Sequence, residues 1–144
     1  MSATPKIEEK AVSDQPKEKE ISDSGDLGDY TVAIKDYRLV KDYSGKDAIL
    51  VRFDFTNNSE EPQMFMVAVN SDVYQDGVEL ETAILIDVKD YDSAQSMKKI
   101  KKGATITVES GYVLGNLASD VEVETKELIS MNDDVLKKTF KIAK

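Results

Sequence analysis

The chain has 144 residues, a length typical of one domain, and carries 19 basic and 28 acidic side chains, which give a formal net charge of -9. This charge repels nucleic-acid phosphates and anionic membrane surfaces, so we expect no nucleic-acid partner. Histidine and cysteine are both absent, which excludes histidine-dependent catalytic triads and the usual zinc sites. We therefore expect a protein that is not an enzyme and that needs no cofactor.

The first 28 residues differ in composition from the rest of the chain. They contain no aromatic residue, have prolines at positions 5 and 16, and are rich in lysine, glutamate, aspartate and serine. Such a segment cannot bury enough apolar surface to offset the entropy lost on ordering. The sequence therefore predicts a disordered acidic tether over residues 1–28 and one folded domain over residues 29–144.

The folded part begins with a strand near Tyr30, where apolar and polar residues alternate with a period of two. The alternation changes parity between Ile34 and Tyr37, which predicts a β-bulge near Asp36. The clearest strand follows over residues 48–56 and ends in the polar turn 57–62. Its apolar face consists of Ile49, Val51, Phe53 and Phe55.

Two further segments extend the pattern. Met64–Val69 is apolar on both faces, which predicts either a central strand or an edge strand that could pair with a second copy of the chain. Asp76–Gly77 is a strong signal for a two-residue hairpin turn, so we expect paired strands within residues 72–82.

Residues 83–98 read as a crossover loop with at most one helical turn. Asp87, Asp90 and Asp92 place three carboxylates at short spacing in this loop, and calcium requires several oxygen ligands at such density. They are the candidate metal ligands. The alternative is that the loop is simply acidic and solvated.

The last part of the chain continues as strands. A turn at Lys102–Gly103 precedes a strand over residues 104–114, in which Gly111 predicts a bulge or a close approach of another segment. Strands over residues 121–126 and 136–142 follow. An alternative for the last of these is a helix over residues 135–141 capped by Asp134.

About seven short strands with regular turns and no long helix predict an all-β fold, an antiparallel β-sandwich. A small closed barrel is the alternative.

Four pieces of sequence in a fixed order carry a resemblance. They are Gly28–Ile34, Lys41–Ile49, Phe53–Ser59 and Val78–Leu80. In these pieces the chain resembles a family of unknown function from Gram-positive bacteria, similar to the immunoglobulin-like domains of surface lipoproteins and of a mycobacterial immunoprotective extracellular antigen. The resemblance implies an immunoglobulin-like sandwich of about seven to eight strands and an extracellular or cell-surface location. It supplies no catalytic residues.

Members of that family begin with a signal peptide and a lipid-modified cysteine, followed by a polar linker. Residues 1–5 contain neither a signal peptide nor a cysteine. We therefore expect a longer natural precursor, attached to a membrane only through a lipid anchor that this sequence does not contain.

Four residues are candidates for partner binding. Tyr74 and Tyr91 offer amphipathic aromatic surface, while Lys98 and Lys99 begin a basic run suited to an acidic protein or an anionic cell-wall polymer. The alternative is that they belong to the rim of the sandwich and to a solvated loop.

The sequence is compatible with two functions. The first is a non-catalytic surface module that binds a protein, a wall polymer or its own copy. The second is a surface lipoprotein that binds calcium or a small molecule in the 83–98 loop. A partly polar pocket beside that loop would favour the second function, and a flat aromatic patch over a solid core would favour the first.

Overall fold

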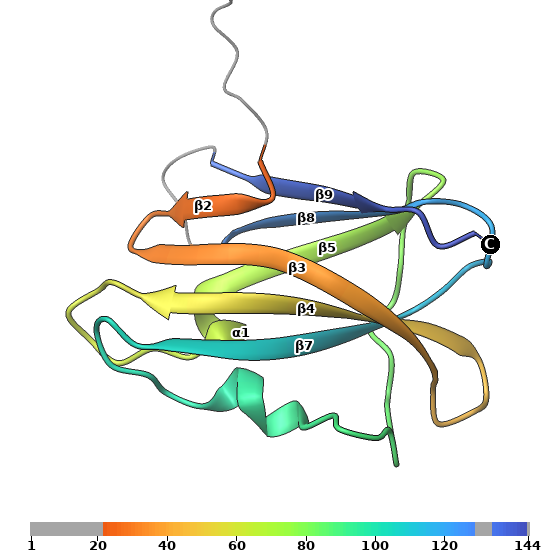
Figure 1. Cartoon of the computed structure of the whole chain (residues 1–144), viewed down its shortest axis with the longest axis horizontal. Coiled ribbons are helices and arrows are strands. Elements are labelled where there is room, and N and C mark those ends of the chain that lie inside the picture. Colours follow the sequence, from red (N-terminus) through yellow and green to blue (C-terminus); the bar gives the residue numbers. More distant parts are fainter. Residues whose placement is uncertain (1–21, 129–133, 144) are drawn as a thin grey trace, which may run out of the picture.

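The computed structural model describes residues 22–128 and 134–143, and within these ranges the chain forms two four-stranded antiparallel sheets (Figure 1). The first sheet consists, in spatial order, of β2 (Ser24–Leu27), β3 (Tyr30–Lys41), β4 (Asp47–Asn57) and β7 (Thr105–Val113). The second consists of β6 (Val78–Glu79), β5 (Val69–Gln75), β8 (Val121–Glu127) and β9 (Leu136–Phe140). Two short helical turns complete these elements, α1 (Phe65–Ala68) and the 3-10 helix η1 (Ser93–Met97).

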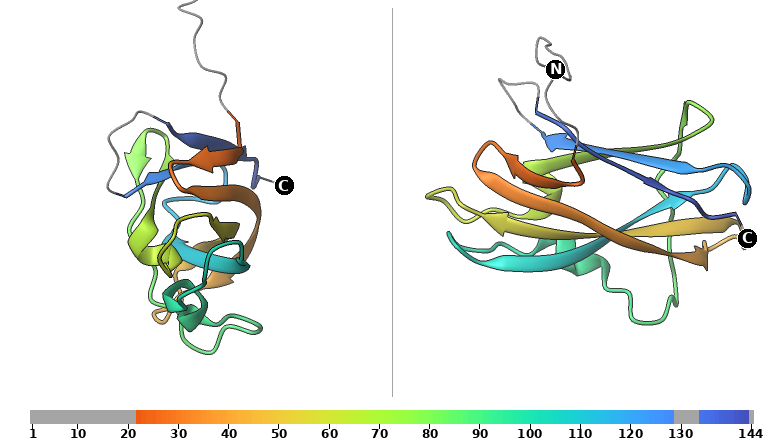
Figure 2. Two further views of the ribbon diagram at one scale, coloured as in Figure 1. Left: turned by 90° about the vertical axis from the view of Figure 1, so that its left-hand side faces the viewer. Right: turned by 45° about the horizontal axis from the view of Figure 1, so that its top comes forward.

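The strand order is that of an immunoglobulin-like sandwich. With β2 set aside, β3-β4-β7 corresponds to strands A, B and E, and β6-β5-β8-β9 corresponds to C′, C, F and G. The all-β antiparallel sandwich predicted from the sequence is confirmed. In the described ranges no strand occupies the D position beside β7, where the chain instead forms a loop and η1; Figure 2 shows the layers from two more directions.

The core lies between the two sheets, and β4 contributes its centre. Ile49, Val51, Phe53 and Phe55 are all fully buried, which confirms the predicted face. Leu50, on the opposite face, is buried too, because Leu85 from the loop after β6 lies over it and over Gly111.

Gly111 permits this covering. A Cβ atom at position 111 would lie 2.8 Å from Cδ1 of Leu85, which is too close for a real side chain. The pairing of β4 with β7 continues without a shift through Leu50 and Gly111. The predicted close approach is therefore confirmed, and there is no bulge at this position.

Several other local predictions are confirmed. The register of β3 against β4 shifts between Ile34 and Tyr37. Asp76 and Gly77 have φ angles of 54° and 79° and join β5 to β6 in a two-residue turn. Residues 83–98 form a loop with one 3-10 turn, and the last segment is strand β9 rather than a helix.

The prediction for Met64–Val69 is wrong. Phe65–Ala68 forms one helical turn, and β5 begins only at Val69. Phe65 and Ala68, three positions apart, are buried on one side, whereas Met66 and Val67 are each 52% exposed. The apolar run therefore reflects a helical turn against the core, and the edge strand expected to mediate self-association does not form here.

The predicted boundary at residue 28 is wrong in its last part. Ser24–Leu27 pairs with residues 30–33 of β3 as strand β2, and Leu27 is buried in the core. Leu27 is the one apolar residue of β2. The strand forms because its backbone also pairs with that of β3. The predicted tether over residues 1–21 lies outside the described residues.

Candidate functional site

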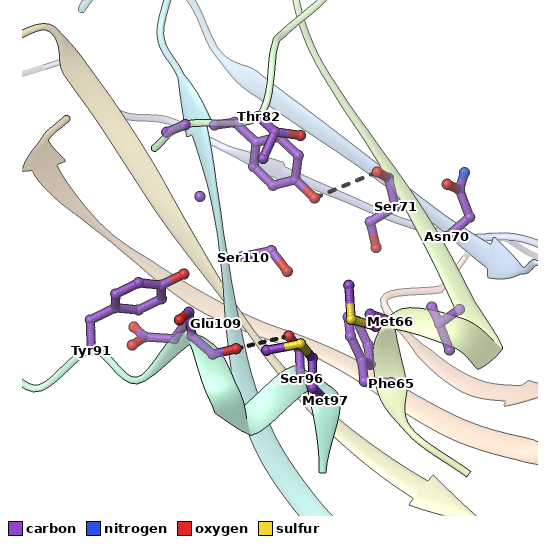
Figure 3. A pocket seen from close by; sticks show the side chains of 15 residues that line it. Phe65, Met66, Asn70, Ser71, Thr82, Tyr91, Ser96, Met97, Glu109 and Ser110 are labelled. Atoms are coloured by element: carbon purple, nitrogen blue, oxygen red, sulfur yellow. Dashed lines mark hydrogen bonds between the residues drawn. The ribbon is translucent and has the colours of Figure 1, made fainter. Parts of the chain in front are cut away.

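A groove of about 420 Å³ opens between β5 and β7. Its walls come from these two strands, from α1 and η1, and from Thr82, Ala83 and Tyr91 of the connecting loop (Figure 3). In an immunoglobulin-like sandwich that has a D strand, this strand lies beside the equivalent of β7. The groove lies at that position. The groove is therefore a consequence of the topology.

The floor of the groove carries hydroxyl groups. Ser110 and Tyr112 alternate with residues of the outer face along β7, and Ser71 faces them from β5. The Tyr112 hydroxyl donates a 3.5 Å hydrogen bond to the carbonyl of Ser71 (Figure 3). Ser71 also forms a 3.0 Å hydroxyl–hydroxyl hydrogen bond with the buried Thr125. The inner faces of the sandwich are thus partly polar at this end.

Tyr112 is the group in the groove whose ionisation is most strongly shifted. Burial raises the pKa of Tyr112 to about 12; a hydrogen bond with Ser110 lowers it, and the charge of Asp72 raises it. Because its folded-state pKa lies above the ordinary value of 10.0, Tyr112 contributes stability that is fully present below pH 10 and is lost as the pH rises towards 12.

Replacing Tyr112 with phenylalanine is expected to remove this alkaline loss. Between pH 9 and 12, the free energy of unfolding of the native chain should fall by up to about 3 kcal/mol more than that of Tyr112→Phe. Urea unfolding at a series of pH values measures the difference. Parallel pH profiles for the two proteins would show that folding does not raise the pKa of Tyr112.

The opposite end of the groove is apolar. Phe65 anchors it, with its ring centroid 5.2 Å from that of Phe53 and 5.6 Å from that of Phe55. Met66 and Met97 lie above it, and about half of each side chain is exposed. Because methionine side chains adapt readily to different shapes, this end suits an apolar group without demanding one particular form.

The third side of the groove carries charge. The guanidinium of Arg38 donates two 3.0 Å hydrogen bonds to the Glu109 carboxylate and a 2.7 Å bond to the carbonyl of Lys89. This pairing joins the connecting loop to the first sheet. Burial raises the pKa of the neighbouring Tyr91, and the charges of Glu109 and Asp92 raise it further.

The predicted metal ligands are not gathered into a site. Asp90 and Asp92 line a second hollow of about 240 Å³, together with Arg52, Gln95, Thr107 and Glu109, but Asp87 does not line it. Asp92 caps η1 by accepting the amide of Ala94 at 2.9 Å, and Asp87 and Asp90 each have a φ of 59°. Asp is common in such turns. In residues 22–128 and 134–143, no three acidic, cysteine or histidine side chains are grouped to hold a metal.

Of the four predicted partner-binding residues, Tyr91 lines the groove. Tyr74 lies on the outer face of β5, opposite Glu79 and Glu122. Lys98 and Lys99 are exposed directly after η1. The structure therefore does not bring the four residues into one surface.

The sequence-based prediction missed most of the groove, including Ser71, Ser110 and Met97. One signal was present in the sequence. Ser110 interrupts an inward-facing series that is otherwise apolar or aromatic, Ile106, Val108 and Tyr112. A polar residue at such a position indicates that the inner face is accessible there.

A family described as a domain of unknown function (DUF5067) matches residues 5–127. The chain belongs to the DUF5067 family. No curated protein matches it. Within residues 22–128 and 134–143 of this chain, no helix is long and apolar enough to cross a membrane.

Solved structures similar to this DUF5067 chain support the fold. A protein from Enterococcus faecalis, solved by NMR, is 23% identical with a TM-score of 0.60, and the match covers 84% of this chain and 90% of that one. The yjhA protein from Bacillus subtilis is 13% identical with a TM-score of 0.56, over 85% and 97% of the two chains. An uncharacterized β-sandwich protein from Clostridium difficile 630 is 15% identical with a TM-score of 0.54, over 89% and 99%. At these identities the similarity establishes the sandwich architecture.

Proposed function

We propose that this DUF5067 protein is a non-catalytic binding module of the bacterial cell surface and that the groove between β5 and β7 is its binding site. The observation that carries the proposal is the groove itself. Its volume of about 420 Å³ falls in the range of small-ligand sites, and it combines an apolar end with a few polar groups. It also adjoins the 83–98 loop, so of the two functions that the sequence leaves open it favours the second, a surface lipoprotein that binds its ligand beside this loop.

The chemistry of the groove supports binding rather than catalysis. A serine nucleophile needs an adjacent base, and the chain has no histidine. The carboxylate that lines the groove is that of Glu109, and it is held by the guanidinium of Arg38 in two hydrogen bonds. Both oxygens of the Glu109 carboxylate are therefore engaged by Arg38.

The cell-surface location rests on the sequence resemblance to Gram-positive surface lipoproteins and to the mycobacterial extracellular antigen. The polar composition of the first 21 residues supports it, because it matches the linker that follows a lipid anchor in such proteins. Fractionation of the native bacterium with an antibody to this domain tests the location. We expect the protein in the envelope fraction, and recovery in the cytosol would contradict the proposal.

Two adjacent residues of α1 allow a matched test of the groove. Met66 lines it and Val67 does not, although both side chains are 52% exposed. Because both sites are exposed, Met66→Lys and Val67→Lys should each change the free energy of unfolding by no more than about 0.5 kcal/mol.

Met66→Lys is expected to reduce the retention of envelope components on the immobilised full chain at least tenfold, whereas Val67→Lys should retain as much as the native protein. Quantitative capture from a detergent extract of the native envelope measures this retention. Equal retention by all three proteins would exclude the groove as the binding site.

A further inference from the structure

The middle of β7 presents backbone groups to the groove. In an antiparallel strand, the N–H and C=O of one residue point to the same side, and successive residues alternate. The amide of Leu114 donates to Asp47 beside β4, whereas the amide of Val113 donates to Glu81 on the other side. The backbone groups of Gly111 and Glu109 therefore point away from β4, towards the groove.

The two ends of this edge are already occupied. Near its end, Val113 pairs with Glu81, and the carbonyl of Gly111 accepts the amide of Ala83 at 2.9 Å. Nearer its start, the Gln95 side chain donates to the carbonyl of Thr107 at 3.4 Å. Between them, the structure gives neither the N–H nor the C=O of Glu109 a backbone partner within the described ranges.

The facing edge of β5 is similarly open. The carbonyl of Val73 accepts the amide of Leu80, beside β6, so the backbone of Ser71 points to the same side. There the carbonyl of Ser71 receives only the long bond from Tyr112 among the described residues. The groove thus lies between two short stretches of strand, at Glu109 and Ser71, whose edges face no further strand of the described ranges.

Exposed strand edges select one kind of ligand. Alternating N–H and C=O groups pair with the backbone of an extended peptide, which adds a strand to the sheet. Residues 81–83 already pair with β7 in this manner, through the bridge between Thr82 and Tyr112. The adjoining stretch at Glu109 has the same geometry, and no backbone group of residues 22–128 or 134–143 outside the strand pairing is bonded to it.

The charged residues beside the groove further restrict the kind of peptide that could bind. Glu109 lines both the groove and the second hollow, which Asp90 and Asp92 also line. Arg38 pairs with Glu109, and Arg52 lines the second hollow. Two further carboxylates thus lie beside Glu109, in a chain whose net charge is -9, and they favour a basic ligand side chain at this point.

We propose that the groove binds a short extended peptide that pairs with the backbone of Glu109 as an added strand. The peptide places an apolar side chain between Met66 and Met97 and a basic side chain near Glu109. This inference rests on the proposed function, because it names the ligand class of the same groove.

Three pools of acetylated, amidated pentapeptides test the proposal with the isotope-labelled full chain. The outer positions vary among valine, threonine, leucine and methionine, and the central residue is lysine in one pool and glutamate in the second. The third pool repeats the lysine pool with every backbone amide methylated. The measurement is the shift of each protein amide in NMR spectra, together with its rate of hydrogen exchange.

We expect the lysine pool to shift the amides of Ser71, Glu109 and Gly111 and to slow exchange at Glu109 at least tenfold. The glutamate pool should bind at least threefold more weakly, and the methylated pool should have no effect. Met66→Lys should weaken binding of the lysine pool at least tenfold, and Val67→Lys should leave it unchanged.

Equal shifts with the methylated pool would overturn strand addition, and equal binding of the lysine and glutamate pools would overturn the charge preference. If no pool shifts these amides while Met66→Lys still reduces retention of envelope components, the peptide inference fails and the proposed function stands. If Met66→Lys changes neither measurement, both fail.

Discussion

Replacing Phe53 with alanine is expected to lower the free energy of unfolding by about 3–5 kcal/mol. Phe53 is fully buried at the centre of β4, between Ile34 of β3 and Val108 of β7, and its ring packs on that of Phe65. Alanine would leave a cavity that the surrounding strands cannot close without breaking their pairing. Urea unfolding of the two proteins measures the difference.

The neighbouring residue supplies the control. Arg52 points to the other face of β4, where its side chain is 45% exposed and its Nε lies 3.2 Å from the Asp36 carboxylate. An exposed ion pair of this kind contributes about 0–1 kcal/mol, so Arg52→Ala should cost no more than that. Equal unfolding midpoints for the two variants would show that the assigned faces of β4 are wrong.

Asn57→Ala is expected to cost about 2–4 kcal/mol. Asn57 ends β4 and is fully buried. Its amide nitrogen donates to the carbonyls of Glu61 at 2.8 Å and Ile100 at 2.9 Å, and its oxygen accepts both the amide and the hydroxyl of Ser59. Alanine removes all four bonds, although the carbonyls of Glu61 and Ile100 each keep one other donor, the Ser59 hydroxyl and the amide of Gln63.

Asn58 provides the comparison for this second variant. It is exposed, and its side chain donates one bond of 2.9 Å, to the Thr31 hydroxyl. Asn58→Ala should therefore cost less than about 1 kcal/mol. Thermal unfolding of both variants tests the contrast, and a similar loss for each would mean that the bonds of Asn57 do not stabilise the turn.

The parts of the fold that the sequence predicts correctly are those decided by local pattern. Alternation identified the buried face of β4, a parity change identified the bulge in β3, and Asp76–Gly77 identified a hairpin. Met64–Val69 failed because an entirely apolar run has no period that separates a strand from a helical turn. Strand β2 was missed because its pairing with β3 is not visible in its own composition.

The groove was harder to predict, for a related reason. It exists because no described segment pairs with the middle of β7, and an absent neighbour leaves no local pattern. Tyr91, which the sequence offers as a candidate for partner binding, lines this groove. Asp87, Asp90 and Asp92 were selected because their spacing suggested a cation site, whereas Asp92 caps η1 and the other two occupy turns with positive φ.

Strand β2 also determines where a recombinant fragment of this domain should begin. It covers one end of the edge of β3, from Tyr30 to Ala33. A recombinant fragment that started at residue 29 would leave that end of the sheet open to pairing with another molecule, so it would be prone to aggregate. The four residues of β2 therefore protect the solubility of the folded domain, and fragments for binding studies should begin before Ser22.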